Sequence, residues 1–179
     1  MKKLFTILFV FLFLGCQDDV TGLDEVLVNP LDETQVDYET PAFVFYPNQF
    51  DVSLSSSFQA EVFAMGVENL RGVNVVIQYD QNKLNLVNVN NGEMASGTGG
   101  SKPMIFVDTE TPGQAEIVAV YISTDSASVS GNIKIAEMVF TAKSTGSSTL
   151  DFTSECEMLD PDDNPIQING YGNGVVNAE

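Results

Sequence analysis

The sequence predicts an all-β domain, built as two packed sheets and covering residues 41–179. Two observations support this prediction. From Pro41 onward, short runs of alternating apolar and polar residues follow one another, and Gly, Pro, Asn, Asp and Ser separate them. In addition, no window of helical length repeats its apolar residues with the helical period of about 3.6 behind a capping residue.

The alternation gives the expected strands in chain order. It is clearest in residues 71–86 (RGVNVVIQYDQNKLNL), where every second residue from Val73 to Tyr79 is apolar. The stretch Met94–Pro103 is the longest without such a pattern, and we expect a surface loop there. Strands are expected near 42–46, 50–54, 58–65, 72–79, 84–89, 104–107, 115–123, 133–142, 149–153, 156–159, 166–168 and 173–177.

The N-terminal residues have the pattern of an export signal. A short positive head, Met1-Lys2-Lys3, precedes the run Leu4–Leu14, which is apolar except for Thr6. Such a run is too short to span a bilayer, which needs about 20 apolar residues. We therefore expect residues 1–15 to form a cleaved signal peptide.

The end of the apolar run, Leu12–Cys16 (LFLGC), resembles the lipobox of bacterial lipoproteins. In that motif a peptidase cuts before the Cys, which then carries acyl chains, so the resemblance implies lipidation of Cys16. Phe13 departs from the motif, because Leu is usual there. The alternative is an ordinary signal peptide that contains a Cys. The following Gln17–Asp19 resembles a tract that directs some lipoproteins to the outer face of a two-membrane envelope. The implied location is therefore exported and lipid-anchored, at the outer membrane or cell surface.

Residues 16–40 are expected to form an acidic flexible tether after the lipidated Cys. Between Gln17 and Thr40 there are eight acidic residues and no Lys or Arg. Such a segment repels itself and buries little apolar surface. The lipid on Cys16 would then be the chain's contact with the membrane, and the tether would hold the domain away from it.

Charge and composition exclude several classes of function. The chain has a net charge of −18, which argues against nucleic acid and anionic membrane surfaces as partners. It contains no His and no Trp, so Ser-His-Asp and Cys-His catalysis and His-ligated zinc are absent. No pair of carboxylates stands out for glycoside hydrolysis. We therefore expect neither an enzyme nor a cofactor.

Two further features leave alternatives open. The cluster Asp160–Asn164 (DPDDN) fails the EF-hand pattern, so it is either a polar hairpin turn or an irregular structural calcium site. Cys156 has no disulfide partner if Cys16 takes lipid, and we expect it to be a small buried apolar residue.

Three stretches resemble, in the right order, the motifs of one family. Gly72–Asp80 (GVNVVIQYD) resembles a strand ending in an aromatic-Asp pair. Gly131–Lys143 (GNIKIAEMVFTAK) resembles a Gly-x-Leu segment that leads into a Phe-x-Ala strand. Leu159–Asn164 and Gly174–Val176 resemble a closing hairpin and a Gly-Val-Val terminal strand. On these motifs, residues 41–179 are similar to a cohesin module, the receptor domain that captures dockerin modules in cellulosomes and related surface assemblies.

The resemblance implies a two-sheet jelly-roll β-sandwich of about nine strands that works without catalysis. In cohesins, one flat sheet face takes up the dockerin helices, largely through polar residues with a few apolar contacts. The implied partner is therefore a dockerin-containing protein, such as a polysaccharide-degrading enzyme. Relatives with the same sandwich include cellulose-binding modules, so a carbohydrate-binding surface module is the alternative. A generic envelope lipoprotein is a third.

Strand alternation predicts which residues would face a partner. If Val73, Val75, Ile77 and Tyr79 point into the core, the residues between them point outward. The later strand is expected to place Val118, Val120 and Ile122 inward and its alternate residues outward. Asn74 and Thr124 also fall near contact positions of the family. The expected partner-binding residues are Asn74, Val76, Gln78, Tyr121, Ser123 and Thr124. The alternative is that Asn74, Gln78 and Ser123 are ordinary solvated positions.

Overall fold

The computed structural model describes residues 38–122 and 127–179. The expected signal peptide, Cys16 and most of the expected tether lie outside these residues. Within them the regular structure is strand, apart from one turn of 3-10 helix, η1 (Glu93–Ser96). No helix in the described ranges is long and apolar enough to cross a membrane. The predicted all-β class is confirmed.

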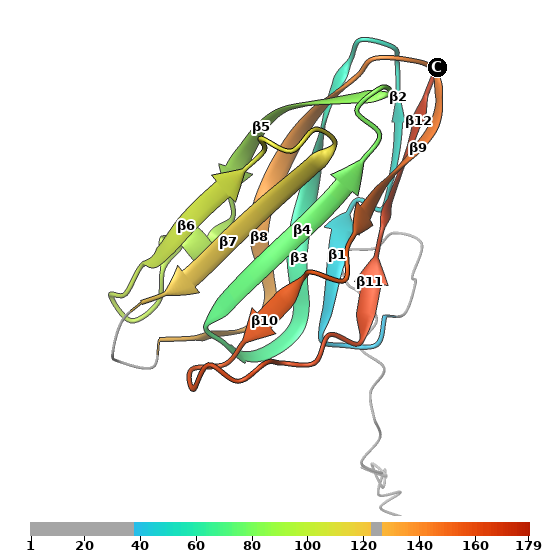
Figure 1. Cartoon of the computed structure of the whole chain (residues 1–179). Helices are drawn as coiled ribbons and strands as arrows, with labels where there is room; N and C mark the ends of the chain where they lie inside the picture. Colours follow the sequence, from blue (N-terminus) through green and yellow to red (C-terminus); the bar gives the residue numbers. More distant parts are fainter. Residues whose placement is uncertain (1–37, 123–126) are drawn as a thin grey trace, which may run out of the picture.

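The strands form two sheets that pack face to face, and Figure 1 looks onto the seven-stranded one. The five-stranded sheet has the order β11 (Gly170–Gly172), β1 (Ala42–Tyr46), β3 (Ser57–Leu70), β8 (Val129–Ala142), β5 (Leu84–Asn91). The other sheet runs β2 (Gln49–Val52), β12 (Gly174–Ala178), β9 (Gly146–Phe152), β4 (Gly72–Tyr79), β7 (Gln114–Tyr121), β6 (Pro103–Asp108), and β10 (Glu157–Leu159) also pairs with β4.

The described residues form twelve strands, more than the nine or so that the resemblance implies, because three long strands are each divided into two. Pro47, which cannot donate to a ladder, separates β1 from β2, and these two strands lie in different sheets. Asn173 separates β11 from β12, which also lie in different sheets. Residues 153–156 separate β9 from β10, which both pair with β4. The jelly-roll sandwich implied by the resemblance is thus confirmed.

Two expectations about single segments need correction. The strand expected at 166–168 is absent, and β11 follows at Gly170–Gly172 instead. In the stretch Met94–Pro103, expected to be a loop, η1 comes first and an isolated bridge then joins Thr98 to Ser101. Alternation over three residues is too short to distinguish a strand from an extended connection.

Aromatic rings join the two sheets in the core. Phe45 of β1 stacks on Phe152 of β9, with ring centroids 4.6 Å apart. Phe140 of β8 contacts Tyr79 of β4 edge to face, at 5.2 Å. The inward direction predicted for Val73, Val75 and Ile77 is confirmed, since all three belong to the main buried cluster.

Cys156 is a free cysteine and is buried, as the sequence predicts. Its thiol accepts a hydrogen bond from the Val76 N–H at 3.3 Å. Burial raises the pKa of the Cys156 thiol above its ordinary value, although backbone hydrogen bonds from Val76 and Thr153 act in the opposite direction. The side chain therefore behaves as a small apolar core residue.

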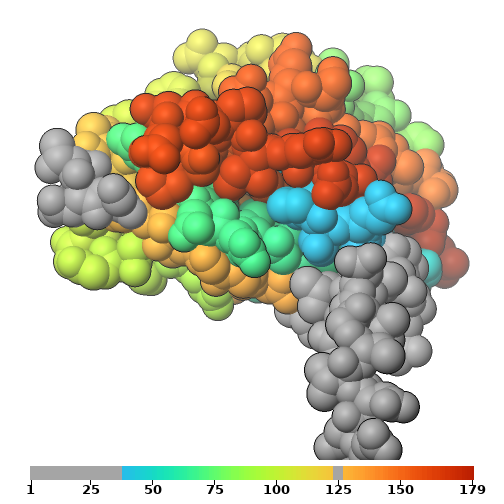
Figure 2. All heavy atoms as spheres, turned by 90° about the horizontal axis from the view of Figure 1, so that it is seen from below, coloured from blue at the N-terminus to red at the C-terminus, as the bar shows by residue number. Residues whose placement is uncertain are grey.

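A second apolar cluster covers part of the outer face of the five-stranded sheet. Figure 2 shows β1, in blue, between the green β3 and the orange-red C-terminal segment. The cluster consists of Ala42, Val44, Phe63 and Met65, with Tyr38 and Tyr46 packed against them. At its border, Lys134 Nζ forms an ion pair with Glu61 Oε1 at 2.9 Å. Over β1 and β3, the apolar side chains of this outer face are thus already buried.

Candidate functional site

The outer face of the seven-stranded sheet brings four strands side by side. β10 pairs with β4, β4 with β7, and β7 with β6, and these strands cross the front of Figure 1. Residues opposite each other in paired strands point to the same side of a sheet. The register places Gly72 opposite Val120, which is opposite Met104. It also places Asn74 opposite Val118, which is opposite Phe106.

Apolar side chains project from this face. Met104 is 54% exposed and Phe106 is 58% exposed, although both are large apolar residues. Val118 and Val120 lie beside them on β7 and are partly buried. We call Met104, Phe106, Val118 and Val120 the apolar strip. Exposed apolar side chains that cluster on one face are typical of a protein-binding surface.

A groove of about 320 Å³ runs between the apolar strip and β10. Its apolar wall includes Val118, Val120 and Leu159. Gly72 keeps the floor open, because a Cβ at this position would lie 3.1 Å from Val120 Cγ2. A side chain larger than hydrogen would thus press on the strip. The groove can accept an apolar side chain from a partner.

Carboxylates border the groove without balancing cations. Glu116 of β7 and Glu157 of β10 both line it. In the described part of the chain, the ion pairs are Arg71–Asp163 and Lys134–Glu61, so neither glutamate is paired. The groove therefore combines an apolar centre with a negative border.

Arg71, directly before β4, links the end of β7 to the loop that follows β10. Its Nε donates to the Tyr121 carbonyl oxygen at 2.9 Å, and its Nη1 donates to the Pro161 carbonyl oxygen at 3.0 Å. Nη1 also contacts Asp163 Oδ1 at 2.9 Å. The end of β7 and the loop after β10 are thus connected through one guanidinium group.

Asn74, expected to face a partner, lies in this groove. Its side chain is partly buried, and Nδ2 is 3.4 Å from the Glu155 carbonyl oxygen. Its Oδ1 is buried and makes no hydrogen bond within the described residues. A buried acceptor without a partner costs free energy, so a ligand's donor would be favoured there.

Val76 does not face a partner, contrary to the sequence-based expectation. It is only 1% exposed and belongs to the main buried cluster. The residues between β9 and β10 lie against it: the Thr153 N–H donates to the Val76 carbonyl oxygen at 2.9 Å, and Cys156 Sγ contacts the Val76 N–H. Alternation fixes the direction of a side chain, but it does not reveal whether another segment covers that side chain.

Tyr121 is also buried, so its predicted outward direction is wrong. Its side chain is 0% exposed, and its hydroxyl donates to the Met94 carbonyl oxygen at 3.3 Å. The register explains the error: Val73 and Val75 point inward, so their partners Ala119 and Ile117 point inward as well. From Ile117 to Ile122 the residues of both alternate sets are apolar, so alternation over this part could not choose between them. Ser123 and Thr124, also expected as contacts, lie outside the described residues.

The apolar strip and Glu116 were not among the residues expected from the sequence. The strand at β6 reads PMIFVD, in which both alternate sets contain large apolar residues. Only pairing with β7 decides that Met104 and Phe106 point outward. The inward direction expected for Val118, Val120 and Ile122 is wrong. Val118 and Val120 lie on the outer face opposite Asn74 and Gly72, and Ile122, directly after β7, is 61% exposed.

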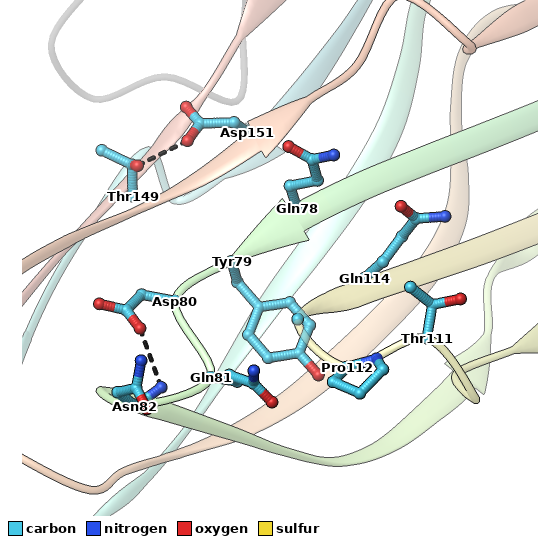
Figure 3. Close-up of a pocket in the computed structure, with 11 residues that line it drawn as sticks. Gln78, Tyr79, Asp80, Gln81, Asn82, Thr111, Pro112, Gln114, Thr149 and Asp151 are labelled. Carbon is cyan, nitrogen blue, oxygen red and sulfur yellow. Dashed lines mark hydrogen bonds between the residues drawn. The ribbon is translucent and has the colours of Figure 1, made fainter.

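Gln78 is exposed, as expected, but it lies at the opposite end of this face from the apolar strip. There it lines a second pocket, which is polar (Figure 3). Its cross-strand neighbours are Gln114 on β7 and Asp151 on β9. The expected partner-binding residues Asn74 and Gln78 are thus not brought together.

The Asp160–Asn164 segment has the hydrogen bonds of a polar turn. Asp160 Oδ1 accepts from the backbone N–H groups of Asp162 and Asn164, each at 2.9 Å. Hydrogen bonds from the Asn164 backbone and side chain lower the pKa of the Asp160 carboxyl below its ordinary value. Among residues 38–122 and 127–179, no group of three or more His, Cys, Asp or Glu side chains could hold a metal ion.

Comparison with known proteins identifies the family. The family model described as the cohesin domain matches residues 54–177. The chain belongs to the cohesin family. This family is a non-catalytic protein-interaction module. No curated protein matches the chain.

Solved cohesin structures share the fold at low sequence identity. A non-cellulosomal cohesin from the archaeon Archaeoglobus fulgidus superimposes with a TM-score of 0.62 at 17% identity, covering 77% of this chain and 91% of that one. A cohesin of Acetivibrio cellulolyticus scaffoldin B, solved with a dockerin, gives 0.64 at 17% identity, covering 77% and 99%. A Clostridium thermocellum cohesin in a dockerin complex gives 0.64 at 13% identity, covering 80% and 99%.

Proposed function

We propose that this cohesin-family chain is a docking module that binds a dockerin-bearing partner on the outer face of β10, β4, β7 and β6. The apolar strip carries this proposal, because Met104 and Phe106 are each more than half exposed on a flat sheet face. The dockerin complexes of other cohesins support the choice of partner class. The outer face of the other sheet is less suitable, since its apolar side chains on β1 and β3 are already buried.

The strip and the groove would supply the affinity of docking. A few buried apolar anchors usually account for most of the binding energy of a protein interface. Here Phe106 and Met104 would be covered by the partner, and one apolar side chain of the partner would enter the groove beside Val118 and Val120. The unpaired carboxylates of Glu116 and Glu157 at the border favour a partner with Lys or Arg around that side chain.

Calorimetric titration tests this function. The full chain in detergent is titrated with calcium-loaded dockerins encoded in the same genome. We expect at least one dockerin to bind, and the association to weaken as salt rises, because the border carboxylates attract a basic partner less strongly at high ionic strength. The double substitution Glu116→Gln, Glu157→Gln should reduce this salt dependence. No heat with any of these dockerins would contradict the proposed function.

We extend the proposal to the location of the protein. The lipobox-like end of the apolar N-terminal run supports lipidation of Cys16, and the acidic tether would hold the domain away from the membrane. The partner would then be recruited to the cell envelope, and a polysaccharide-degrading enzyme is the kind of partner that such recruitment would serve.

The lipid anchor makes its own prediction. The Cys16→Ala chain is expected not to incorporate labelled palmitate in the producing cells, because the thiol that accepts the acyl chain is absent. The buried Cys156 provides the matched control, and Cys156→Ala should label normally. Labelling is read by autoradiography of the purified chain. If the Cys16→Ala chain remained labelled, the anchor would have to be placed elsewhere.

A further inference from the structure

A second pocket lies at the upper end of the seven-stranded sheet, away from the apolar strip. It has a volume of about 580 Å³, within the range of about 300–1,000 Å³ usual for small-ligand pockets. Its floor is formed by side chains of β9, β4 and β7, and two turns, 79–82 and 111–113, form its walls (Figure 3). Along β4, the buried Val76 separates this pocket from Asn74 in the groove.

The pocket walls are held in a fixed arrangement by hydrogen bonds. The Tyr79 N–H donates to the Gly113 carbonyl oxygen at 2.9 Å, which joins the two turns. Gly113 has a φ of +78°, and a Cβ there would lie 2.9 Å from the Tyr79 carbonyl oxygen. Lys143 Nζ donates to the Gln81 carbonyl oxygen at 2.7 Å. A pocket with such fixed walls loses little conformational entropy when a ligand binds.

Both carboxylates of the pocket are already engaged. Asp80 Oδ1 accepts from the Asn82 N–H at 2.9 Å. Asp151 accepts from Thr149 Oγ1 at 2.6 Å and from Asn173 Nδ2 at 3.0 Å. No Lys or Arg lines the pocket. Anionic ligands are therefore disfavoured, and the carboxylates are oriented as acceptors.

Three glutamine side chains, in contrast, have no hydrogen-bond partner among the described residues: Gln78, Gln81 and Gln114. Gln78 and Gln114 lie opposite each other on neighbouring strands, so their amides project side by side over the sheet. Each amide offers donors and an acceptor. The Tyr79 ring, which also lines the pocket, packs against Phe140 of the core with ring centroids 5.2 Å apart.

From this chemistry we propose that the pocket binds a neutral saccharide. Hydroxyl groups both donate and accept hydrogen bonds, as the unpaired glutamine amides do. A neutral sugar ring carries several hydroxyl groups and no charge. This would be a second binding activity beside docking. It would place the module on a glycan while the apolar strip remains free for the partner.

Affinity electrophoresis of the full chain in a non-glycosidic detergent tests this site. Native gels contain either a neutral polysaccharide (hydroxyethylcellulose, arabinoxylan or mixed-linkage β-glucan) or the anionic polygalacturonate. We expect retardation by at least one neutral polysaccharide and none by polygalacturonate. The double substitution Gln78→Ala, Gln114→Ala should lower the association constant at least about fivefold, since two hydrogen bonds are lost.

Two matched controls separate this site from the docking face. Gln59→Ala removes an exposed glutamine from β3 of the other sheet and should leave retardation unchanged. Phe106→Ala should also leave it unchanged, whatever its effect on dockerin binding. The proposal is overturned if no neutral polysaccharide retards the chain or if the glutamine pair has no effect. It is overturned as well if the pair weakens dockerin binding alone, because the pocket would then belong to the docking face.

Discussion

Phe106→Ala is expected to weaken binding of the dockerin partner by about ten- to a hundredfold and to leave the fold intact. Phe106 is 58% exposed, so its ring contributes little to the core and is available to a partner. It lies opposite Val118 in the apolar strip. Truncating an aromatic residue that a partner covers commonly costs about 1.4–2.7 kcal/mol of binding free energy, which corresponds to this loss.

The measurement is the calorimetric dissociation constant for the full chain and its dockerin. Val87→Ala provides a matched control, because Val87 is similarly exposed at 57% but lies on β5 of the other sheet. Val87→Ala should bind like the unaltered chain. Equal losses from both substitutions would show that the effect is not local, and an unchanged affinity for Phe106→Ala would move the docking surface off this face.

Phe45→Ala is expected to lower the free energy of unfolding by about 3–5 kcal/mol, the range for removing a buried Phe side chain. Phe45 is 1% exposed, and its ring stacks on Phe152 with 4.6 Å between centroids. Because Phe45 is on β1 and Phe152 on β9, this contact joins the two sheets. A domain of this size is stable by about 5–15 kcal/mol, so the loss would be a large part of the total.

Urea unfolding of the full chain, followed by far-ultraviolet circular dichroism, measures this loss. Phe106→Ala serves here as the control, since it removes the same side chain from an exposed position and should change stability by less than about 1 kcal/mol. A similarly small change for Phe45→Ala would mean that the β1–β9 contact does not hold the sandwich together.

Several features of the fold followed from local patterns in the sequence. The alternation in Gly72–Tyr79 correctly placed Val73, Val75 and Ile77 in the core, because only one of its two alternate sets is continuously apolar. The all-β class and most strand positions were predictable for the same reason. The family motifs identified the cohesin fold before any geometry was known.

The binding face was harder to predict, because its strands have two apolar sides. In β7, the residues from Ile117 onward are apolar in both alternate sets, and the set containing Tyr121 is the buried one. In β6, the same ambiguity concealed Met104 and Phe106. The direction of each side chain is determined by the register with β4, whose core side is unambiguous.

The sequence by itself determined the class of the domain, its family and the core side of β4, because these depend on residues close together in the chain. The tertiary structure alone decided which surface is apolar, polar or covered. Phe106 meets Val118 through strand pairing, residues 153–156 bury Val76, and Gln78 meets Gln114 at the end of the sheet. Each of these contacts depends on how separate segments pair or pack, and the alternation within one strand contains no information about such pairing.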